Sequence, residues 1–250
     1  MNINIDNCGQ AVEAVFSDDN VRDIFLPLLR RLTDLHRAKG GRVLALLAAP
    51  PGSGKSTLAA LLRQLSLETP GLCPLAVIGM DGFHRRQRYL DTHTTVRDGV
   101  EIPLARIKGA PETFDLEALC AALARVAAGE DCPWPTYDRM LHDPVPDALR
   151  VTEPVVLMEG NYLLLDAPGW RDLRNLADAT VSIVADPDML RRRLIARHVA
   201  TGKTLEAATR HVDDSDMRNA RLCLEHSLPA DLTLTLRADG TFAASDLPQG

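Results

Sequence analysis

The feature that most constrains this chain is a glycine-rich segment directly behind a short apolar run. The run at residues 43–47 has the length and composition of a buried strand, and Ala-Ala-Pro-Pro-Gly-Ser-Gly-Lys-Ser-Thr follows it at residues 48–57. A strand that ends in a glycine-rich turn and feeds a helix lets backbone N–H groups surround phosphate groups. The segment therefore predicts a P-loop.

The residues of this segment have separate roles in such a loop. Glycines let the chain bend without a Cβ in the way. Lys55 would reach the β- and γ-phosphates, and Ser56 would bind Mg²⁺ through its hydroxyl. The predicted nucleotide contacts are Gly52, Ser53, Gly54, Lys55, Ser56 and Thr57. The usual signature has glycine where this chain has Ala49, so the turn must begin with a negative φ or carry strain.

Apolar runs alternate with helical patterns along the rest of the chain. Further strands are predicted at 75–78, 155–158, 180–184 and, more weakly, 232–236, and helices at 21–35, 116–128, 189–199 and 205–224. Strands that alternate with helices pair in parallel through right-handed crossovers. The sequence predicts an α/β P-loop NTPase, a three-layer sandwich with a mainly parallel five-stranded sheet, a helical lid and an N-terminal lead-in helix.

Composition excludes several classes of partner. A net charge of −6 leaves no overall basic surface for a polyanion, which argues against nucleic acid. The N-terminus lacks the features of a signal peptide, and no apolar run approaches the ~20 residues of a membrane span. The five cysteines are scattered without a C-x-x-C pair, which indicates free thiols. We therefore expect a cytoplasmic protein with neither a nucleic acid nor a membrane as partner.

Two acidic residues follow predicted strands, at the sheet edge where α/β proteins bind ligands. Asp81, in Met-Asp-Gly-Phe-His at 80–84, could accept the proton of a hydroxyl that attacks the γ-phosphate, or help to hold Mg²⁺. Alone, an Asp-Gly pair is also an ordinary turn. Glu159 ends the apolar run 155–158, the Walker B arrangement in which a carboxylate binds Mg²⁺ or its waters. The sequence does not decide which carboxylate is the main metal contact.

Basic residues cluster after the fourth strand. They are Arg191, Arg192, Arg193, Arg197, His198 and Lys203. Cations on consecutive turns of a helix could close over a triphosphate and neutralise the charge of the transferring group. A charged, solvated helix face is the ordinary alternative. The lid interpretation predicts nucleotide contacts from Arg193, Arg197 and Lys203, with a catalytic role for Arg193.

With these pieces in order, the chain resembles the P-loop kinase superfamily that contains uridine kinase, phosphoribulokinase and bacterial pantothenate kinase. It is also similar to the bacterial kinases of fructose transport systems within that group. The resemblance rests on Met-Asp-Gly-Phe at 80–83, Lys-Gly-Ala-Pro-Glu-Thr-Phe-Asp at 108–115 and Pro-Thr-Tyr-Asp-Arg-Met-Leu-His at 135–142. It implies ATP as phosphoryl donor, Mg²⁺ as cofactor and a small-molecule hydroxyl as acceptor.

The resemblance also implies which residues touch the acceptor. These are Asp81, Phe83, Tyr137, Arg139 and His142. Uridine kinases have an aromatic residue at the position of Arg139. An arginine there instead offers a planar guanidinium group, which suits a carboxylate, a phosphate or sugar hydroxyls. Uridine kinases also place an aspartate at the position of Gly109 to bind ribose hydroxyls, so its absence counts against a nucleoside.

The sequence therefore predicts a small-molecule kinase whose acceptor is a sugar or a pantothenate-like compound. Its catalytic residues would be Asp81, Lys55 and Arg193, and its metal ligands Ser56 and Glu159. The predicted organisation is a helical lead-in segment at 1–40, a P-loop kinase domain at 41–237 and a tail at 238–250. The preferred nucleotide and the oligomeric state, a homodimer included, stay open.

Two other functions compete with this prediction. One is a nucleoside kinase, and the other is a nucleotide-hydrolysing switch or accessory ATPase without an acceptor. Asp-Ala-Pro-Gly at 166–169 matches the D-x-x-G of GTPase switches, but no Asn-Lys-x-Asp guanine-binding motif occurs in the chain. The switch is the weaker alternative on that account.

Overall fold

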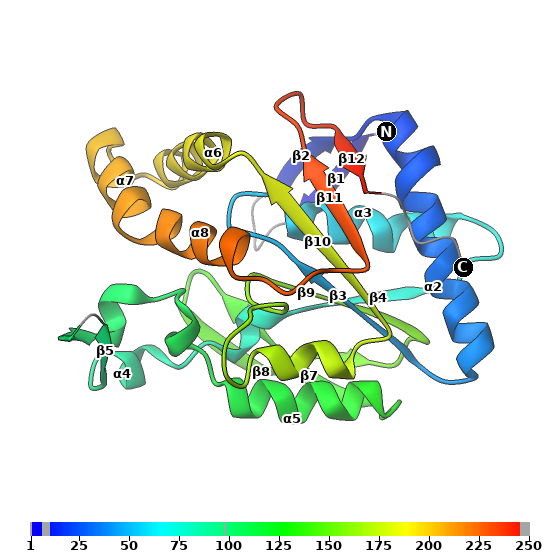
Figure 1. The fold of residues 1–250 in the computed structure, drawn as a ribbon, viewed down its shortest axis with the longest axis horizontal. Helices are drawn as coiled ribbons and strands as arrows, with labels where there is room; N and C mark the ends of the chain where they lie inside the picture. Colours follow the sequence, from blue (N-terminus) through cyan, green and yellow to red (C-terminus); the bar gives the residue numbers. More distant parts are fainter. Residues whose placement is uncertain (1, 7–10, 98, 246–250) are drawn as a thin grey trace.

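A central, mainly parallel sheet organises the protein (Figure 1). The computed structural model describes residues 2–6, 11–97 and 99–245. In this part of the chain the sheet has the order β12-β11-β10-β3-β9-β4, and every neighbouring pair is parallel except β11 with β12. Its strands are β3 (Val43–Ala48), β4 (Leu75–Gly79), β9 (Val155–Gly160), β10 (Ala179–Ala185), β11 (Leu232–Leu236) and β12 (Phe242–Ala244).

Helices cover both faces of this sheet. On one face, α2 (Leu26–Lys39) and α3 (Lys55–Glu68) pack against Val43, Ala45 and Leu47 of β3 in what we call the first hydrophobic cluster. On the other, α5 (Leu116–Ala127) packs with the alternate residues of β3 in the second hydrophobic cluster. Parallel strands buried on both faces have continuous apolar sequences. The predicted three-layer α/β sandwich is confirmed.

The strand count is a correction to the sequence prediction, which placed five strands in the sheet. The sixth, β12, lies in the segment expected to be a loose tail. An Asp-Gly turn at 239–240 reverses the chain after β11, and the buried Asn20 side chain bonds both the N–H and the carbonyl of Phe242. A three-residue strand is too short to give a periodic pattern.

The N-terminal segment holds more than the predicted helix. The predicted helix at 21–35 corresponds to the π-helical turn η1 (Val21–Phe25) followed by α2, which ends at Gly40 in the left-handed conformation. A hairpin of β1 (Asn2–Asp6) and β2 (Ala11–Val15), then the short α1 (Asp18–Asn20), precede them. The hairpin was not predicted.

The surface excursion after β4 leads into α5, and a hairpin of two further strands follows that helix. The excursion contains η2 (Met80–Phe83), α4 (Gln87–Leu90), β5 (Thr94–Arg97), β6 (Val100–Pro103), η3 (Leu104–Ile107) and η4 (Pro111–Thr113), followed after α5 by the hairpin of β7 (Cys132–Asp138) and β8 (Asp143–Val151). A further 3₁₀ turn, η5 (Arg171–Leu176), precedes β10. The hairpin β7–β8 was not predicted.

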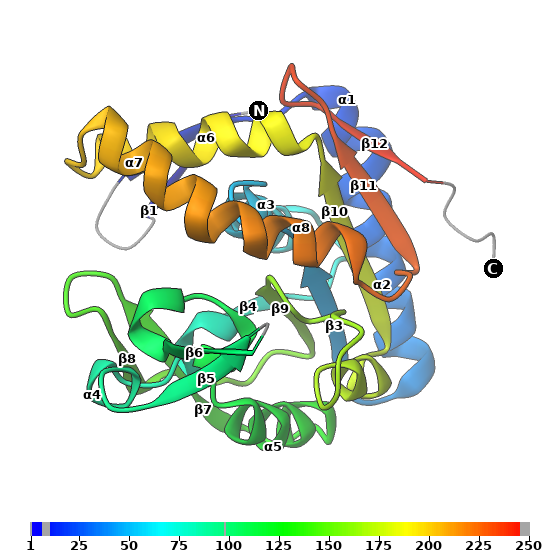
Figure 2. The same cartoon turned by 60° about the vertical axis from the view of Figure 1, so that its left-hand side comes forward.

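Three helices form the arm expected to be a lid. They are α6 (Pro187–Ala200), α7 (Leu205–His211) and α8 (Met217–Glu225), with the π-helical turn η6 (Val212–Asp216) between the last two. The predicted helix at 205–224 is therefore interrupted. Figure 2 shows this arm on one side of the sheet edge and β5–β8 on the other.

Two further expectations bear on the described residues. Among these residues, no helix combines the length and the apolar character that crossing a bilayer requires. Cys73, Cys120, Cys132 and Cys223 are free thiols, as expected. Cys8 lies outside the described residues.

Candidate active site

The P-loop has the conformation its sequence predicts. Gly52 and Gly54 have φ of 82° and 84°, and α3 begins at Lys55 directly after them. A Cβ at Gly52 would meet Leu194 of the lid helix α6 at 3.0 Å, so this glycine allows the loop and the lid to touch. Outside glycine, the described residues with positive φ are His142 and Asp147. Ala49 is thus accommodated at negative φ, without left-handed strain.

Ser56 and Glu159 meet at the predicted metal position. Glu159 lies on β9 between Leu47 of β3 and Gly79 of β4 in the strand register. The Ser56 hydroxyl donates a 2.7 Å hydrogen bond to Glu159 Oε1. The first turn of α3 and the end of β9 thus bring together two oxygen donors from residues far apart in sequence.

The electrostatics of Glu159 show which groups surround it. Burial raises the pKa of its carboxyl, and the Asp81 charge raises it further. Lys55, the Ser56 hydrogen bond and Arg139 act in the opposite direction. Charges from the P-loop, the turn after β4 and the hairpin β7–β8 therefore converge on the end of β9.

Asp81 occupies η2, two residues beyond the end of β4. Its side chain is 46% exposed, and Oδ1 lies 4.0 Å from Nε2 of His84, whose own side chain is only 9% exposed. Burial lowers the pKa of His84, and Phe114 stacks on its ring with centroids 4.0 Å apart. Asp81 is thus an accessible carboxylate beside a buried, neutral imidazole.

The acceptor residues predicted from the resemblance have different surroundings. Burial, with the charges of Asp143 and Asp81, raises the pKa of Tyr137 to about 12. Arg139 is exposed near the end of β7, and His142 is exposed in the turn of the hairpin. Phe83 is buried in the second cluster, its ring 5.0 Å from that of Trp134. The Asp81 charge therefore reaches Tyr137, and Arg139 and Asp81 both act on Glu159, whereas Phe83 packs in the core.

The basic residues of the lid also differ from one another. Arg191 forms a double hydrogen bond with Asp213 at 2.6 and 2.8 Å, which occupies it on the lid surface. Arg193 is partly buried on α6, and Lys203 is exposed in the turn before α7. Arg197 is exposed over much of its side chain, but partial burial of its guanidinium lowers its pKa. The charges of Asp216 and Asp81 act in the opposite direction, and that of Arg139 adds to the decrease. Among the basic residues of the lid, Arg197 is therefore the one whose pKa is affected by the charge of Asp81.

Unsatisfied polar atoms mark the same sheet edge. Within the described residues, the buried side-chain atoms without a hydrogen-bond partner are Ser53 Oγ, His84 Nδ1 and Asn161 Oδ1. Each lies in the loop that follows one of three adjacent strands, β3, β4 or β9. Buried polar groups in native proteins are nearly always hydrogen-bonded, to the protein or to water, so Ser53 Oγ and Asn161 Oδ1 are the atoms at this edge for which a bound polar group or a water would supply the partner.

Three further residues lie beside the candidate site and were not among the predicted site residues. His84 and Asn161 have only their places next to the two acidic motifs as a signal. Lys108 donates 2.7 Å hydrogen bonds to the Gln87 side chain and to the carbonyl of His142, and lies over the Tyr137 ring. Lys108 belongs to a motif that was recognised, but its contacts depend on the hairpin β7–β8.

Gly82 supports a prediction about how the Asp81 turn is held. A Cβ at this position would overlap the backbone carbonyl of Pro135. Because neither backbone can yield cheaply, we expect Gly82→Ala to lower the free energy of unfolding by roughly 1–3 kcal/mol, the usual cost of overpacking. Denaturant unfolding measures this change. Gly41→Ala, with nothing within 4 Å of its Cβ, is the control. If Gly82→Ala and Gly41→Ala had the same free energy of unfolding, the close approach of Gly82 to the Pro135 backbone would be contradicted.

Comparison with known proteins gives one consistent group. Residues 44–231 match the model of the Phosphoribulokinase / Uridine kinase family. YggC, an uncharacterized protein of Escherichia coli K12, is 37% identical over 243 residues, which cover 97% of this chain and 98% of that protein. A Schizosaccharomyces pombe protein, provisionally described as a uridine kinase, is 34% identical over 200 residues, 77% of this chain and 83% of the other.

A solved structure agrees with these similarities. The crystal structure of a Silicibacter protein, provisionally described as a fructose transport system kinase, superposes with a TM-score of 0.70 at 35% sequence identity. The match covers 81% of this chain and 98% of that one. The similarity therefore extends over most of both chains.

Proposed function

Because the chain belongs to the phosphoribulokinase/uridine kinase family and is a small-molecule kinase, we propose that it transfers the γ-phosphoryl group of ATP to a hydroxyl of a sugar or a pantothenate-like acceptor. The observation that carries the proposal is the convergence of P-loop and strand-end groups on Glu159, which accepts the Ser56 hydrogen bond and on which the charges of Lys55 and Asp81 both act. These are the groups that phosphoryl transfer to an alcohol requires.

The donor atoms at this edge fit Mg²⁺. Ser56 and Glu159 provide hydroxyl and carboxylate oxygens already within 2.7 Å of each other, and Mg²⁺ prefers oxygen ligands. We propose that these two residues hold the ion, which would neutralise charge on the phosphate oxygens. The unpartnered Ser53 hydroxyl in the P-loop is a further polar group that a phosphate oxygen would satisfy.

In the proposed mechanism Asp81 accepts or orients the proton of the acceptor hydroxyl. Its accessible carboxylate, beside the neutral His84, has the exposure that contact with an acceptor needs. Lys55 would steady the charge that develops on the β- and γ-phosphates, and Arg193 and Arg197 of the lid would add to this from the other side. Closure of the lid would also exclude water, which limits wasteful hydrolysis of ATP.

The polar lining of the acceptor side favours a hydroxylated or acidic substrate over a flat base. Arg139 is an exposed guanidinium whose charge acts on both Glu159 and Arg197, so it lies within electrostatic reach of the reacting groups. Lys108 lies on the same side and fixes the hairpin turn through the His142 carbonyl. Cationic groups of this kind bind carboxylates, phosphates and sugar hydroxyls.

We expect Arg139→Ala to raise the KM for the acceptor by roughly 10- to 100-fold, the effect of losing a charged hydrogen bond. The KM for ATP should change little, since the P-loop binds the nucleotide. Steady-state kinetics with each substrate varied in turn measures both constants. Arg150→Ala removes another exposed arginine of the same hairpin and should leave both unchanged. Equal effects of Arg139→Ala on the two substrates would remove Arg139 from the acceptor site.

A nucleoside is the second candidate acceptor, because the fission-yeast relative is described as a uridine kinase. Gly109 and Arg139 argue against it, as they replace residues that uridine kinases use for ribose and base. Coupled ADP release with sugars, sugar acids, polyols, pantothenate and nucleosides as acceptors tests the choice. Stimulation by nucleosides alone would replace the proposed acceptor class, and ADP release independent of every acceptor would favour an accessory ATPase.

A further inference from the structure

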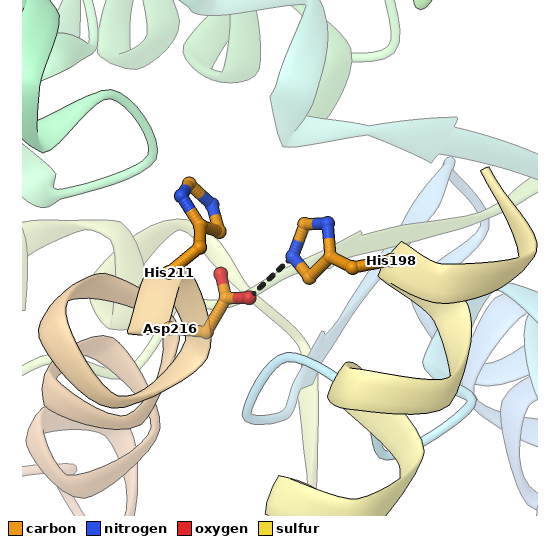
Figure 3. A group of neighbouring side chains, drawn as sticks. All are labelled: His198, His211 and Asp216. Carbon is orange, nitrogen blue, oxygen red and sulfur yellow. Dashed lines mark hydrogen bonds and ion pairs between the residues drawn. The ribbon is translucent and has the colours of Figure 1, made fainter. Parts of the chain in front are cut away.

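Three potential metal ligands meet between the helices of the lid, and none of them is a predicted Mg²⁺ ligand (Figure 3). His198 lies on α6, His211 ends α7, and Asp216 ends the π-helical turn η6. One ligand atom from each lies within 4.8 Å of the other two. His198 Nε2 and Asp216 Oδ2 are 2.8 Å apart, and the two imidazole rings are in edge contact with centroids 4.6 Å apart.

The π-helical turn is what brings His211 and Asp216 together. In η6 the Met217 N–H bonds the Val212 carbonyl five residues back, instead of four as in an α-helix. Residues five apart point to different sides of an α-helix, but the wider turn brings them onto the same side. Single π-helical turns of this kind occur frequently at functional sites. The backbone thus departs from the regular helix at the point where the ligands meet.

Burial and access also suit a bound ion. The side chains of His198 and Asp216 are each 16% exposed, and His211 is exposed. The two half-buried ligands are held by the packing around them, and the exposed one leaves a path for the ion to enter. Ligands of one zinc ion lie about 3.3 Å apart at Zn–N distances of ~2.0–2.1 Å. Side-chain rotations that shift the ligand atoms by up to about 1.5 Å would therefore complete the geometry, with His198 and Asp216 moving slightly apart from their 2.8 Å contact.

We propose that His198, His211 and Asp216 form a second metal site, selective for Zn²⁺ or a similar transition ion, that clamps α6 to the α7–η6 segment. Imidazole nitrogen is a ligand of Zn²⁺, Co²⁺ and Ni²⁺ and not of Mg²⁺. The histidine site would therefore take a transition ion, and the site of Ser56 and Glu159 would take Mg²⁺. His198 directly follows Arg197, the lid cation on which the Asp81 charge acts. A bound ion would therefore fix the helix that carries Arg197.

The test is Zn²⁺ binding by the untagged full chain in excess Mg²⁺, measured by competition with a chromophoric chelator. We expect one equivalent of Zn²⁺ to bind the wild type. His211→Ala should weaken binding by at least about 100-fold, since loss of an outer-shell partner alone costs up to that amount. His93→Ala removes an exposed histidine from the excursion and should bind like the wild type.

Binding of Co²⁺ gives an independent readout, because its visible absorption reports on the coordinating atoms. The wild type and His93→Ala should give the same spectrum, and Asp216→Asn should change or lose it. Zn²⁺ affinity unchanged in both His211→Ala and Asp216→Asn would overturn the proposal, and so would the absence of binding to the wild type. Neither readout depends on kinase activity. Failure of the metal site to bind Zn²⁺ or Co²⁺ would therefore leave the proposed kinase function untouched, and the reverse also holds.

Discussion

Substitution of Asp81 by asparagine is expected to lower kcat by roughly 10²–10⁴-fold, the contribution of a general base. Asparagine keeps the size and most of the hydrogen bonding of the side chain but removes its charge and basicity. A group that acts on the proton only in the transition state should leave nucleotide affinity nearly unchanged. Acceptor-dependent ADP formation, beside a nucleotide titration, measures both quantities.

The control for this variant is Asp147→Asn. Asp147 is an exposed residue of β8 with φ of 52°, a conformation that asparagine also tolerates. Both variants should fold, and only Asp81→Asn should lose turnover. If Asp81→Asn keeps turnover within a few-fold of the wild type, then Asp81 is only a turn residue. Glu159 would then be the next candidate for the base.

Lys55→Ala should reduce kcat/KM for ATP by roughly 10²–10³-fold, the usual effect of removing one group that stabilises developing charge. Lys55 begins α3 directly after the glycine turn, and its charge lowers the pKa of Glu159. Loss of this cation leaves the β- and γ-phosphates without their P-loop lysine. Steady-state kinetics at saturating acceptor measures the change.

Lys39→Ala serves as the matched control, because Lys39 forms a surface ion pair with Asp178 at 2.8 Å. Surface pairs contribute little, so this variant should retain full activity. Far-UV circular dichroism should show both variants folded. Turnover near the wild-type value in a folded Lys55→Ala protein would refute the P-loop assignment.

The sheet and the P-loop could be predicted because their signals are local. A parallel strand buried on both faces is a continuous apolar run, and β11 begins and ends at the predicted residues 232 and 236. The hairpin β7–β8 has no such signal. Its strands contain Pro133, Pro135, Pro144 and Pro146, and proline in an apolar run argues against a strand.

Part of the candidate site could also be predicted from local signals, and part could not. The edge rule for parallel sheets places Asp81 and Glu159 together from sequence alone. The unpartnered atoms of His84 and Asn161, and the ion pair that occupies Arg191, depend on neighbours far along the chain. A π-helical turn has no sequence pattern of its own. The sequence therefore predicted one continuous helix at 205–224 and not the π-helical turn that separates α7 from α8.

The two hydrophobic clusters have a consequence for how such a kinase can diverge. The helix behind the P-loop and the lid helix α6 rest on the first cluster through Leu58 and Leu194. The elements on the acceptor side rest on the second cluster through Phe83 and Trp134. We therefore expect substitutions in the second cluster to disturb the proposed acceptor side more than the packing of α3 and α6. On this view, mutations on one face of the sheet could change the acceptor of such a kinase while the helices proposed to bind ATP keep their own core.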